Sequence, residues 1–399
     1  DARNVTTDES GYADPISLTA PDKSYSLDES NNSVLPYATY DITVDHEGYY
    51  PIVMRGVQVF DGENSLAELN MIPVEDNAQF RAEPEIFDIP EHALFSGDGG
   101  TGAEPAVQCE RILAEVVIPN KIVVHLGRPA VSARNVTVPF RDYIKNVASS
   151  EIYPTWPVEA LKANIYAQIS LALNRIFTEW YRSKGKGYDF DITNSTSYDQ
   201  YYVHGRNIFE SISKVVDEVF NTYIRKQGTI EPYYAEYCDG KSVTCPGMKQ
   251  WGTKSLADQG YSAIRILRYY YGNSVELVTT NNIKDVQESY PGTPLRVGST
   301  GDAVRVIQRQ LNRIVKNYPF MGAIPNVNGV FGADTESTVK KFQKQFSLTA
   351  DGVVGRATWY KISYIYASVK KLAELTSEGE EPSGQPSSGT YPGAALREG

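Results

Sequence analysis

Two short segments near the C-terminus repeat the same order of turn and helix-start residues. The first spans 328–335 (NGVFGADT) and the second spans 351–358 (DGVVGRAT), about two dozen residues later. Each begins with Asn or Asp followed by Gly, which forms a turn, and continues with an apolar pair and a second Gly before a helix. Because repeated units share a core, the pattern predicts a compact helical module at this end of the chain.

The residues on either side of the repeat complete this module. Gly301 and Asp302 precede apolar residues at helical spacing, as expected for an N-capped amphipathic helix. Together with residues 295–299 and 339–343, the segment closely resembles the three-helix peptidoglycan-binding domain over nearly all of 291–368. The resemblance implies binding of cell-wall glycan or stem peptide in a shallow groove. The binding contacts expected from it are Arg296, Gln308, Phe331 and Gln343. The alternative is a helical module that mediates only protein contacts.

Charge is distributed unevenly along the 399 residues. Residues 1–110 contain 22 Asp and Glu against 4 Lys and Arg, whereas residues 291–366 contain 4 against 10. The net charge of −11 argues against general nucleic-acid binding, and we expect no nucleic-acid partner. The local positive charge of the C-terminal module suits the anionic groups of a cell wall. A chain of this length with 41% apolar residues is expected to form more than one domain.

The N-terminal region has the pattern of a small β-structure. Tyr40, Ile42 and Val44 alternate with polar residues as in a half-buried strand, and strand-like runs follow at 51–60 and 65–72. Turn residues separate these runs, so we expect an antiparallel sandwich over 1–74. This region is similar to the carboxypeptidase regulatory-like β-sandwich, which implies no catalysis. Residues 75–110 are acidic and contain Gly and Pro, which predicts a linker or an exposed loop.

Residues 111–275 are expected to form a mixed α/β domain. Apolar runs at 116–118 and 122–124 indicate strands. Apolar residues then recur at helical spacing from about 155 to 181, and a second helix is predicted over 208–225. The predicted fold class is therefore α+β multidomain, with an N-terminal β-sandwich, a mixed α/β domain and a C-terminal three-helix module. A disordered tail is expected at 376–399.

The start of the middle domain resembles the stage II sporulation protein D family. The resemblance is carried by residues 138–154 and 156–163, and it extends more loosely over about 112–272. Members of that family are lytic transglycosylases, which cut the glycan between N-acetylmuramic acid and N-acetylglucosamine. The resemblance thus implies a mixed α/β catalytic domain with Glu151 as its catalytic residue. The alternative is that Glu151 is an ordinary helix-end or surface glutamate.

A lytic transglycosylase needs a single carboxylic acid. The acid protonates the leaving glycosidic oxygen, and its conjugate base then takes the proton of the sugar's own C6 hydroxyl. Hydrolases instead place two carboxylates about 5–9 Å apart. The apolar neighbours Ile152, Tyr153 and Trp156 are of the kind that raises the pKa of an acid. By contrast, Glu159 lies in the first turn of the predicted long helix and is interpreted as structural.

Other segments of the middle domain suggest substrate contacts. Residues 199–205 resemble the family's Asp-Gln-x-Tyr segment, which implies that Gln200 and Tyr202 bind substrate, and Trp251 occupies the place of a family tryptophan. The alternative is a core tyrosine beside a buried glutamine, because any one of 28 tyrosines is weak evidence. The chain departs from the family pattern at 168–170 and 238–240, so no zinc site is carried over.

Three cysteines are too few for a disulfide scaffold. Cys238 and Cys245 are expected to form a local bridge or to stay as free thiols, since a zinc site would need two more ligands. We expect no metal and no cofactor. No stretch has the roughly 18 apolar residues of a membrane span, and no basic region followed by an apolar run indicates a signal peptide.

The order of regions is similar to that of germination-specific spore cortex-lytic enzymes, supported by residues 155–157 and 189–194. This similarity implies peptidoglycan glycan strands as the partner and a location in the spore cortex or coat, or in an extracellular cell wall. It also implies a zymogen that a protease activates. Residues 1 to about 110 would then be a removable pro-segment, cut between Ser96 and Gln108, and the alternative is a permanently attached spacer.

Two other classes of function compete with this interpretation. A non-catalytic wall-binding scaffold would keep the fold of the middle domain without its reaction. An amidase or peptidase would need a metal triad or a Cys–His pair, for which the sequence offers only Cys238 and His204.

Residues 291–366, produced alone, are expected to fold and to sediment with insoluble peptidoglycan, because the repeat encloses its own core and carries local positive charge. Added salt should weaken the interaction to the extent that charge contributes. A sedimentation assay at several salt concentrations measures this, with circular dichroism as the folding control. A folded fragment that stays in the supernatant at low salt would contradict the binding interpretation.

Overall fold

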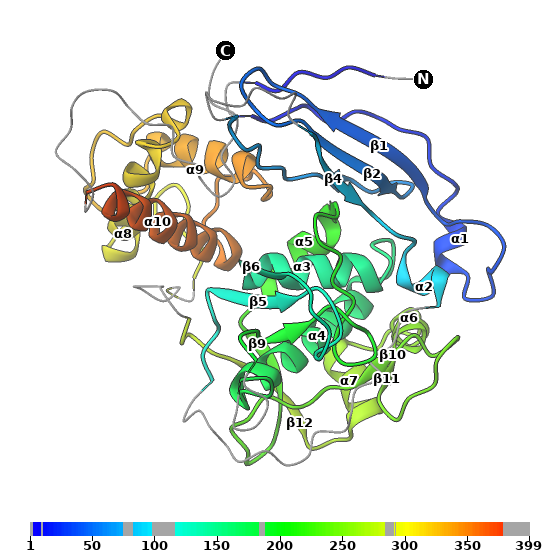
Figure 1. The fold of residues 1–399 in the computed structure, drawn as a ribbon. Coiled ribbons are helices and arrows are strands. Elements are labelled where there is room, and N and C mark those ends of the chain that lie inside the picture. Colours follow the sequence, from blue (N-terminus) through cyan, green and yellow to red (C-terminus); the bar gives the residue numbers. More distant parts are fainter. Residues whose placement is uncertain are drawn as a thin grey trace.

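The computed structural model describes residues 3–8, 11–74, 83–97, 116–182, 188–283, 291 and 293–377. We call residues 3–97 the N-terminal unit, 116–283 the middle unit and 293–377 the C-terminal unit. Strands dominate the first, helices and small sheets make up the second, and helices form the third (Figure 1). The chain is thus a mixed α and β protein, as predicted. No helix within the described residues combines the length and the apolar character needed to cross a membrane.

One three-stranded sheet, in the order β1-β2-β4, forms the body of the N-terminal unit. β1 (Ala38–Val44) pairs antiparallel with β2 (Ile52–Val59), which pairs parallel with β4 (Glu85–Asp88). Every second side chain of β1 is half-buried and those between are exposed, which confirms the predicted alternation. A small core of its own lies against this sheet and includes Met54 and Ile89.

The described residues of this unit do not form the second sheet that the predicted sandwich requires. The strand predicted over 65–72 shortens to β3 (Ser65–Leu66), which pairs with β8 (Ile208–Phe209) of the middle unit. The backbone of this run therefore forms its strand hydrogen bonds with another unit and not within the N-terminal unit.

Part of the predicted linker is ordered. Within 75–110, β4 completes the sheet and the short helix α2 (Ala93–Ser96) follows it. Ile89 and Leu94 are buried, so two apolar anchors stand within an otherwise acidic segment. The Gly-rich stretch lies mostly outside the described residues, which break off between 97 and 116.

The middle unit is built around α4 (Val158–Phe177), in which 16 of 20 residues are buried, as in a helix covered on all sides. The helices that pack around it are α3 (Phe140–Glu151), α5 (Glu210–Val219), α6 (Gln250–Asp258) and α7 (Ala263–Tyr271).

Small sheets flank these helices. One sheet has the strand order β6 (Asn135–Pro139), β5 (Lys121–His125) and β7 (Ile192–Thr193). A second sheet pairs β9 (Thr222–Lys226) with β12 (Val275–Thr279). A third pairs β10 (Tyr237–Cys238) with β11 (Met248–Lys249).

Both helices predicted in the middle unit are present, and both are shorter than predicted. The long helix begins at Val158, because Pro157 is extended (φ −54°, ψ 142°) and serves as its N-cap. The helix predicted over 208–225 spans 210–219, because the apolar residues at its two ends pair as strands β8 and β9. Local periodicity located both helices. Pro157 set the start of the first, whereas long-range strand pairing set the ends of the second.

The N-terminal and middle units share a hydrophobic core. Tyr37, Phe60 and Leu94 belong to the same buried cluster as Tyr153 and Phe209. The ring centroid of Phe60 lies 5.4 Å from that of Tyr153 and 5.2 Å from that of Phe209. The N-terminal unit is therefore packed onto the residues that follow α3.

The short helix α1 (Ser24–Leu27) contacts the turn after α3. The hydroxyls of Ser26 and Thr155 are hydrogen-bonded at 2.7 Å, and Trp156 Nε1 donates to the Ser26 carbonyl oxygen at 3.1 Å. This turn, 152–157, separates α3 from α4 and is thus covered by a segment more than a hundred residues earlier in the chain.

The C-terminal unit contains α8 (Asp302–Val315), α9 (Ala333–Gln345) and α10 (Arg356–Ser377), which confirms the predicted helical module. α10 packs on α8 and also on α5 of the middle unit, where the Tyr360 ring lies 5.4 Å from that of Phe220. The predicted tail lies outside the described residues except for 376–377, which end α10.

Two buried glutamines explain the repeat. Gln308 Nε2 donates to the Val330 carbonyl oxygen at 2.9 Å and to the Thr335 hydroxyl at 3.1 Å. The Oε1 of the same side chain accepts from the Gly329 N–H at 2.9 Å. Gln343 repeats these three contacts in the second half, with Val353, Thr358 and Gly352. Each glutamine therefore ties one turn to the start of the next helix.

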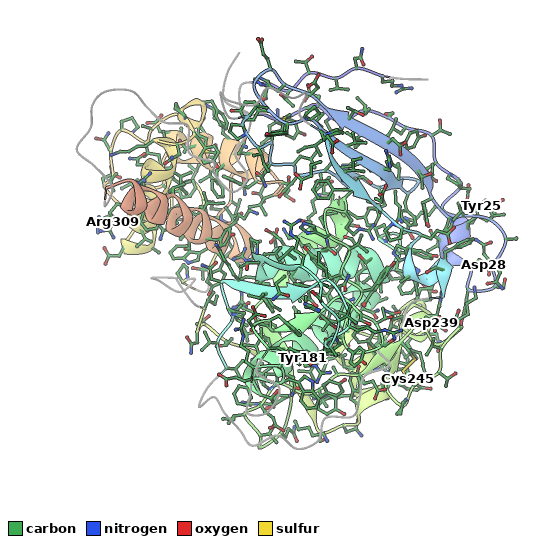
Figure 2. All side chains as sticks on the ribbon, viewed as in Figure 1. Tyr25, Asp28, Tyr181, Asp239, Cys245 and Arg309 are labelled. Atoms are coloured by element: carbon green, nitrogen blue, oxygen red, sulfur yellow. A yellow bond between two sulfur atoms is a disulfide. The ribbon has the colours of Figure 1, made fainter. Side chains whose placement is uncertain are left out.

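Replacing Gln308 or Gln343 by Ala is expected to lower the free energy of unfolding of the C-terminal unit by about 1–3 kcal/mol, since it leaves buried turn N–H and carbonyl groups unpaired. Urea denaturation followed by circular dichroism measures the change. Arg309→Ala is the matched control, because Arg309 is exposed on the same helix as Gln308 (Figure 2). Equal stabilities for the glutamine variants and the control would contradict this role.

Candidate functional site

Glu151 is the last residue of α3. The next residue, Ile152, is extended (φ −132°, ψ 145°), so the chain turns away from the helix directly after the acid. α3 packs against α4 and α5, and only 2% of Glu151 is exposed. The carboxyl therefore lies inside the middle unit and not on a solvated helix face.

Three donors from distant parts of the chain contact the Glu151 carboxyl. The Tyr201 backbone N–H donates to Oε1 at 2.8 Å. Gln168 Nε2 and the Tyr237 hydroxyl donate to Oε2 at 2.8 and 2.6 Å. A carboxylate offers about four acceptor positions on its two oxygens. The three donors use three of these positions, so one acceptor position on Oε1 remains open.

Burial and these hydrogen bonds change the pKa of Glu151 in opposite directions. Burial raises the pKa because the charged form loses its hydration, and the three donors lower it because they stabilise the carboxylate. Burial dominates and raises the pKa of Glu151 to about 7. A large fraction of the molecules therefore holds a proton on this carboxyl at neutral pH, as a general acid requires.

Gln200, predicted to bind substrate, lies in the layer behind these donors. Its Nε2 donates to the Tyr237 hydroxyl at 3.0 Å and to the Gln168 carbonyl oxygen at 3.1 Å. Its Oε1 accepts from the Tyr143 hydroxyl at 2.9 Å. Gln200 is fully buried, so its amide orders the groups around Glu151 from within the protein.

Tyr202 and Trp251, the other predicted substrate contacts, are also buried. The Tyr202 ring stacks on that of Tyr143 with centroids 5.5 Å apart. The Trp251 ring packs against Trp156 at 4.9 Å and Tyr153 at 5.9 Å. Tyr202 thus supports α3, which carries Glu151, and Trp251 supports the turn that follows it. Neither side chain faces solvent in this structure.

Asp199 is a second fully buried carboxylate in this region, and together with Glu151 it adds to the larger effect of burial in raising the pKa of Tyr143. Asp199 Oδ1 accepts from Arg175 Nε at 2.7 Å. Its Oδ2 accepts from the Tyr181 hydroxyl and from the N–H and hydroxyl of Thr193, at 2.7 to 2.9 Å. Both oxygens of this carboxylate are thus engaged within the protein.

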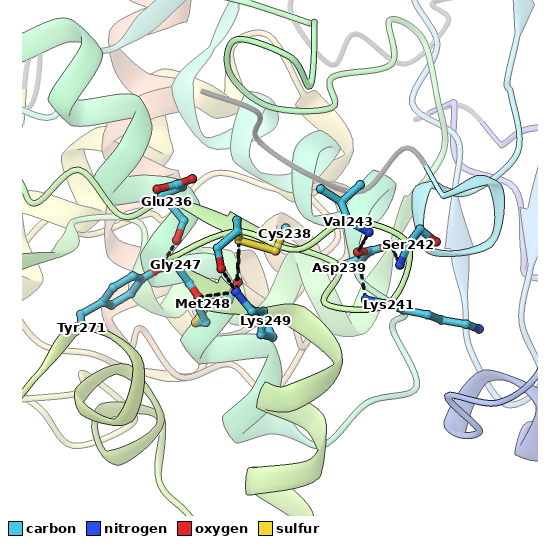
Figure 3. Close-up of a disulfide and its surroundings, with 11 residues drawn as sticks. Glu236, Cys238, Asp239, Lys241, Ser242, Val243, Gly247, Met248, Lys249 and Tyr271 are labelled. Atoms are coloured by element: carbon cyan, nitrogen blue, oxygen red, sulfur yellow. Dashed lines mark hydrogen bonds between the residues drawn. A yellow bond between two sulfur atoms is a disulfide. The ribbon is translucent and has the colours of Figure 1, made fainter. Parts of the chain in front are cut away.

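A disulfide joins Cys238 and Cys245, directly after the tyrosine that contacts Glu151 (Figure 3). The loop between them is held by Asp239, whose carboxylate accepts from the backbone N–H groups of Lys241, Ser242 and Val243. Figure 2 shows Asp239 and Cys245 on the side of the middle unit nearest α1, and Lys241 Nζ donates to the Asn31 carbonyl oxygen at 3.1 Å.

The bridge settles which of the sequence alternatives for the cysteine pair applies. Because Cys238 is bonded to Cys245, its sulfur is not a free thiol that could pair with His204. Across the described ranges, no group of three or more His, Cys, Asp or Glu side chains is arranged as a metal site. Cys109 lies outside these ranges.

Gln168 and Tyr237 are not among the residues predicted from the sequence. Gln168 belongs to the segment 168–170, and Tyr237 precedes the segment 238–240. These two segments are the places where the chain departs from the sporulation-family pattern. One departure therefore includes a residue that contacts the Glu151 carboxyl, and the other begins directly after such a residue. A sequence argument could have used these two positions as a signal.

Among the four predicted wall-binding residues, Arg296 is exposed. Gln308, Phe331 and Gln343 are buried, with at most 1% of each side chain accessible. The two glutamine amides are satisfied by the turns of the repeat, so in this structure these three side chains shape the module and are closed to solvent.

Two known protein families match this chain, one within the middle unit and one within the C-terminal unit. Residues 131–224 match the stage II sporulation protein family, and residues 300–362 match the family described as a putative peptidoglycan-binding domain. The chain thus contains a stage II sporulation protein domain, which includes Glu151, and a C-terminal peptidoglycan-binding domain.

Several curated proteins are similar to parts of the chain. A zinc D-Ala-D-Ala carboxypeptidase of Streptomyces albus G is 42% identical over 74 residues, which are 18% of this chain and 27% of that protein. An N-acetylmuramoyl-L-alanine amidase of Bacillus licheniformis is 31% identical over 120 residues, 30% of this chain and 31% of that protein. The chain spans between about a quarter and a half of the length of the curated relatives that it matches.

Proposed function

We propose that this chain cuts the glycan strand of peptidoglycan as a lytic transglycosylase, with Glu151 as acid and base. The observation that carries the proposal is the buried Glu151 carboxyl, which holds a proton near neutral pH while three donors stand ready to stabilise its charge. Glu151 lies in the stage II sporulation protein domain, and two relatives have names that describe cell-wall activities. Both observations support peptidoglycan as the substrate.

The reaction needs one proton to leave Glu151 and one to return. The protonated carboxyl gives its proton to the glycosidic oxygen as the bond from C1 of the muramic acid to that oxygen breaks. The resulting carboxylate is stabilised by Tyr201, Gln168 and Tyr237. The carboxylate then takes the proton of the C6 hydroxyl, whose oxygen bonds to C1 and closes a 1,6-anhydro ring.

The hydrogen bonds also indicate which oxygen carries the mobile proton. Two donors occupy Oε2, whereas Oε1 has the single Tyr201 N–H. A proton on Oε2 would face two other donors, so Oε1 is the favoured position. The leaving oxygen is therefore expected to approach Oε1.

The state of Asp199 favours a transglycosylase over a glycoside hydrolase. A hydrolase uses a second carboxylate as nucleophile or base. Asp199 is fully buried, is paired with Arg175 through Oδ1 and accepts three hydrogen bonds on Oδ2, so it is held within the protein and does not face a substrate. The C6 hydroxyl of the substrate removes the need for a second carboxylate.

The peptidoglycan-binding domain supports peptidoglycan as the partner, and we infer that it holds the chain on the glycan it cuts. Together, the two domains support a location in a cell wall or spore. The narrower assignment, a cortex-lytic enzyme of the germinating spore in the cortex or coat, is part of this proposal.

A non-catalytic wall-binding scaffold is the second candidate, and burial favours it. Glu151, Gln200, Tyr202 and Trp251 all have at most 4% of their surface exposed. A glycan strand can reach the carboxyl only if a covering segment moves. We infer that α1 is such a segment, because it contacts Thr155 and Trp156 in the turn that follows Glu151.

We further propose that the N-terminal unit is a pro-segment that limits access to Glu151, with a protease as activator. Its contacts with the turn 152–157 support this role. The shared core of Phe60, Tyr153 and Phe209 supports the alternative of a permanent part of the enzyme, because it would keep the unit attached after a cut.

Glu151→Gln is expected to lower the rate of glycan cleavage by about 10²–10⁴-fold or more, because the amide keeps the shape and has no acidic proton. Mass spectrometry of the digest should find 1,6-anhydromuramic ends with the wild type alone. Wild-type cleavage should fall as the pH rises through about 7, where Glu151 loses its proton. Wall binding serves as the control. Wild-type protein that binds peptidoglycan and yields no anhydromuramic ends would support the scaffold.

A chain that begins at Cys109 is expected to cleave peptidoglycan faster than the full chain, because the turn 152–157 is uncovered. The initial rates of both proteins on the same substrate measure the effect. Circular dichroism and binding to peptidoglycan show whether the shorter chain is folded. Equal rates for two folded proteins would leave the N-terminal unit as a spacer.

A further inference from the structure

We propose that Tyr237 is a positioning residue for the acid, and that the Cys238–Cys245 bridge holds its hydroxyl against the Glu151 carboxyl. The bridge then influences how readily the acid releases its proton. This inference rests on the proposed function and deepens it, because it adds a residue and a covalent element to the site.

The Tyr237 hydroxyl has a defined direction. It donates to Glu151 Oε2 at 2.6 Å and accepts from Gln200 Nε2 at 3.0 Å. An amide nitrogen can only donate, so Gln200 directs the hydroxyl proton toward the acid. Gln200 is itself held by Tyr143. The orientation of the Tyr237 hydroxyl is thus prepared before any substrate arrives.

The strand that carries Tyr237 is too short to hold it alone. β10 consists of Tyr237 and Cys238, which pair parallel with Met248 and Lys249. A two-residue parallel ladder contributes few hydrogen bonds. The bridge adds a covalent tie from the residue beside Tyr237 to Cys245, shortly before the partner strand (Figure 3). The bridge therefore adds a constraint on the backbone beside Tyr237 that the short ladder does not supply.

The rest of the loop is held by polar contacts that a change in conformation can break. Asp239 accepts from three backbone N–H groups, and Lys249 Nζ donates to the carbonyl oxygens of Cys245 and Gly247. Cys245 is half-buried, so a small dithiol can reach the bridge. Reduction transfers two electrons and two protons to the two sulfurs, gives two thiols, and oxidises the dithiol to its own disulfide.

Other titratable groups in this region do not take the place of Tyr237 at the Glu151 carboxyl. Asp199 is paired with Arg175, and burial lowers the pKa of His92 well below its ordinary value and keeps the ring neutral. The Tyr143 hydroxyl donates its hydrogen bond to Gln200 Oε1 and not to Glu151. By element these groups are Tyr143 of α3, Arg175 of α4, Asp199 before Gln200, Tyr237 of β10 and His92 before α2.

The role of Tyr237 as a hydrogen-bond donor fixes the direction in which its loss changes the pKa of Glu151. The Tyr237 hydroxyl stabilises the charged form of Glu151 and so lowers its pKa, against the larger effect of burial. Removing or loosening that donor raises the pKa further. The acid then holds its proton to higher pH and releases it less readily to the glycosidic oxygen.

The test is a carbon-13 NMR titration of the glutamate carboxyls in the full chain, in which the Glu151 signal is the one that Glu151→Gln removes. Tyr237→Phe is expected to raise the midpoint of that signal by about one pH unit, the order expected for a hydrogen bond to a charged group. Tyr181→Phe is the matched control, because it removes another buried hydroxyl that donates to a carboxylate, that of Asp199. An unchanged midpoint in folded Tyr237→Phe would overturn the positioning role.

The bridge is tested on the same signal in two ways. Cys245→Ser and wild type treated with a dithiol should both raise the midpoint, by less than Tyr237→Phe, and reoxidation should restore it. The reduced wild type keeps the test valid if Cys245→Ser does not fold. A midpoint that reduction leaves unchanged would overturn the role of the bridge. Because titration needs no turnover, the absence of anhydromuramic products would refute the proposed function and leave these measurements interpretable.

Discussion

The burial of one carboxyl is the constraint on which the middle unit depends. Taking Glu151 out of water disfavours its charged form, and only hydrogen bonds placed by the fold can compensate. The three donors come from α4, from β10 and from the chain before β8, so three segments must converge on the end of α3. The compensation is incomplete, which leaves an acid that titrates near neutral pH.

The other two units are arranged around this site in different ways. The N-terminal unit covers the turn after α3 with apolar rings and with α1, and it also meets the disulfide loop through Asn31. The C-terminal unit packs on α5, on another part of the middle unit, through Tyr360 and Phe220. In the proposed function, control of access and attachment to the wall would thus lie at different ends of the chain, on either side of a scaffold centred on α4.

Short-range patterns were enough to predict much of the architecture. The alternation in β1, the long helix α4 and the repeat around Gln308 and Gln343 each depend on residues close in sequence, where periodicity and turn chemistry are decisive. Predictions failed where pairing is distant. The strand at 65–72 shortened because β3 pairs with β8, and part of the predicted linker became β4 because β2 offered it an edge.

The sequence by itself determined that Glu151 is the candidate acid, that a repeat builds the C-terminal helical module, and that the charge is divided between the two ends. Only the tertiary structure decided that Gln168 and Tyr237 contact the acid and that Gln200, Tyr202 and Trp251 lie beneath the surface. The physical reason is that burial and the pKa of a carboxyl depend on all atoms around it, and here those atoms come from segments up to 86 residues away in the chain.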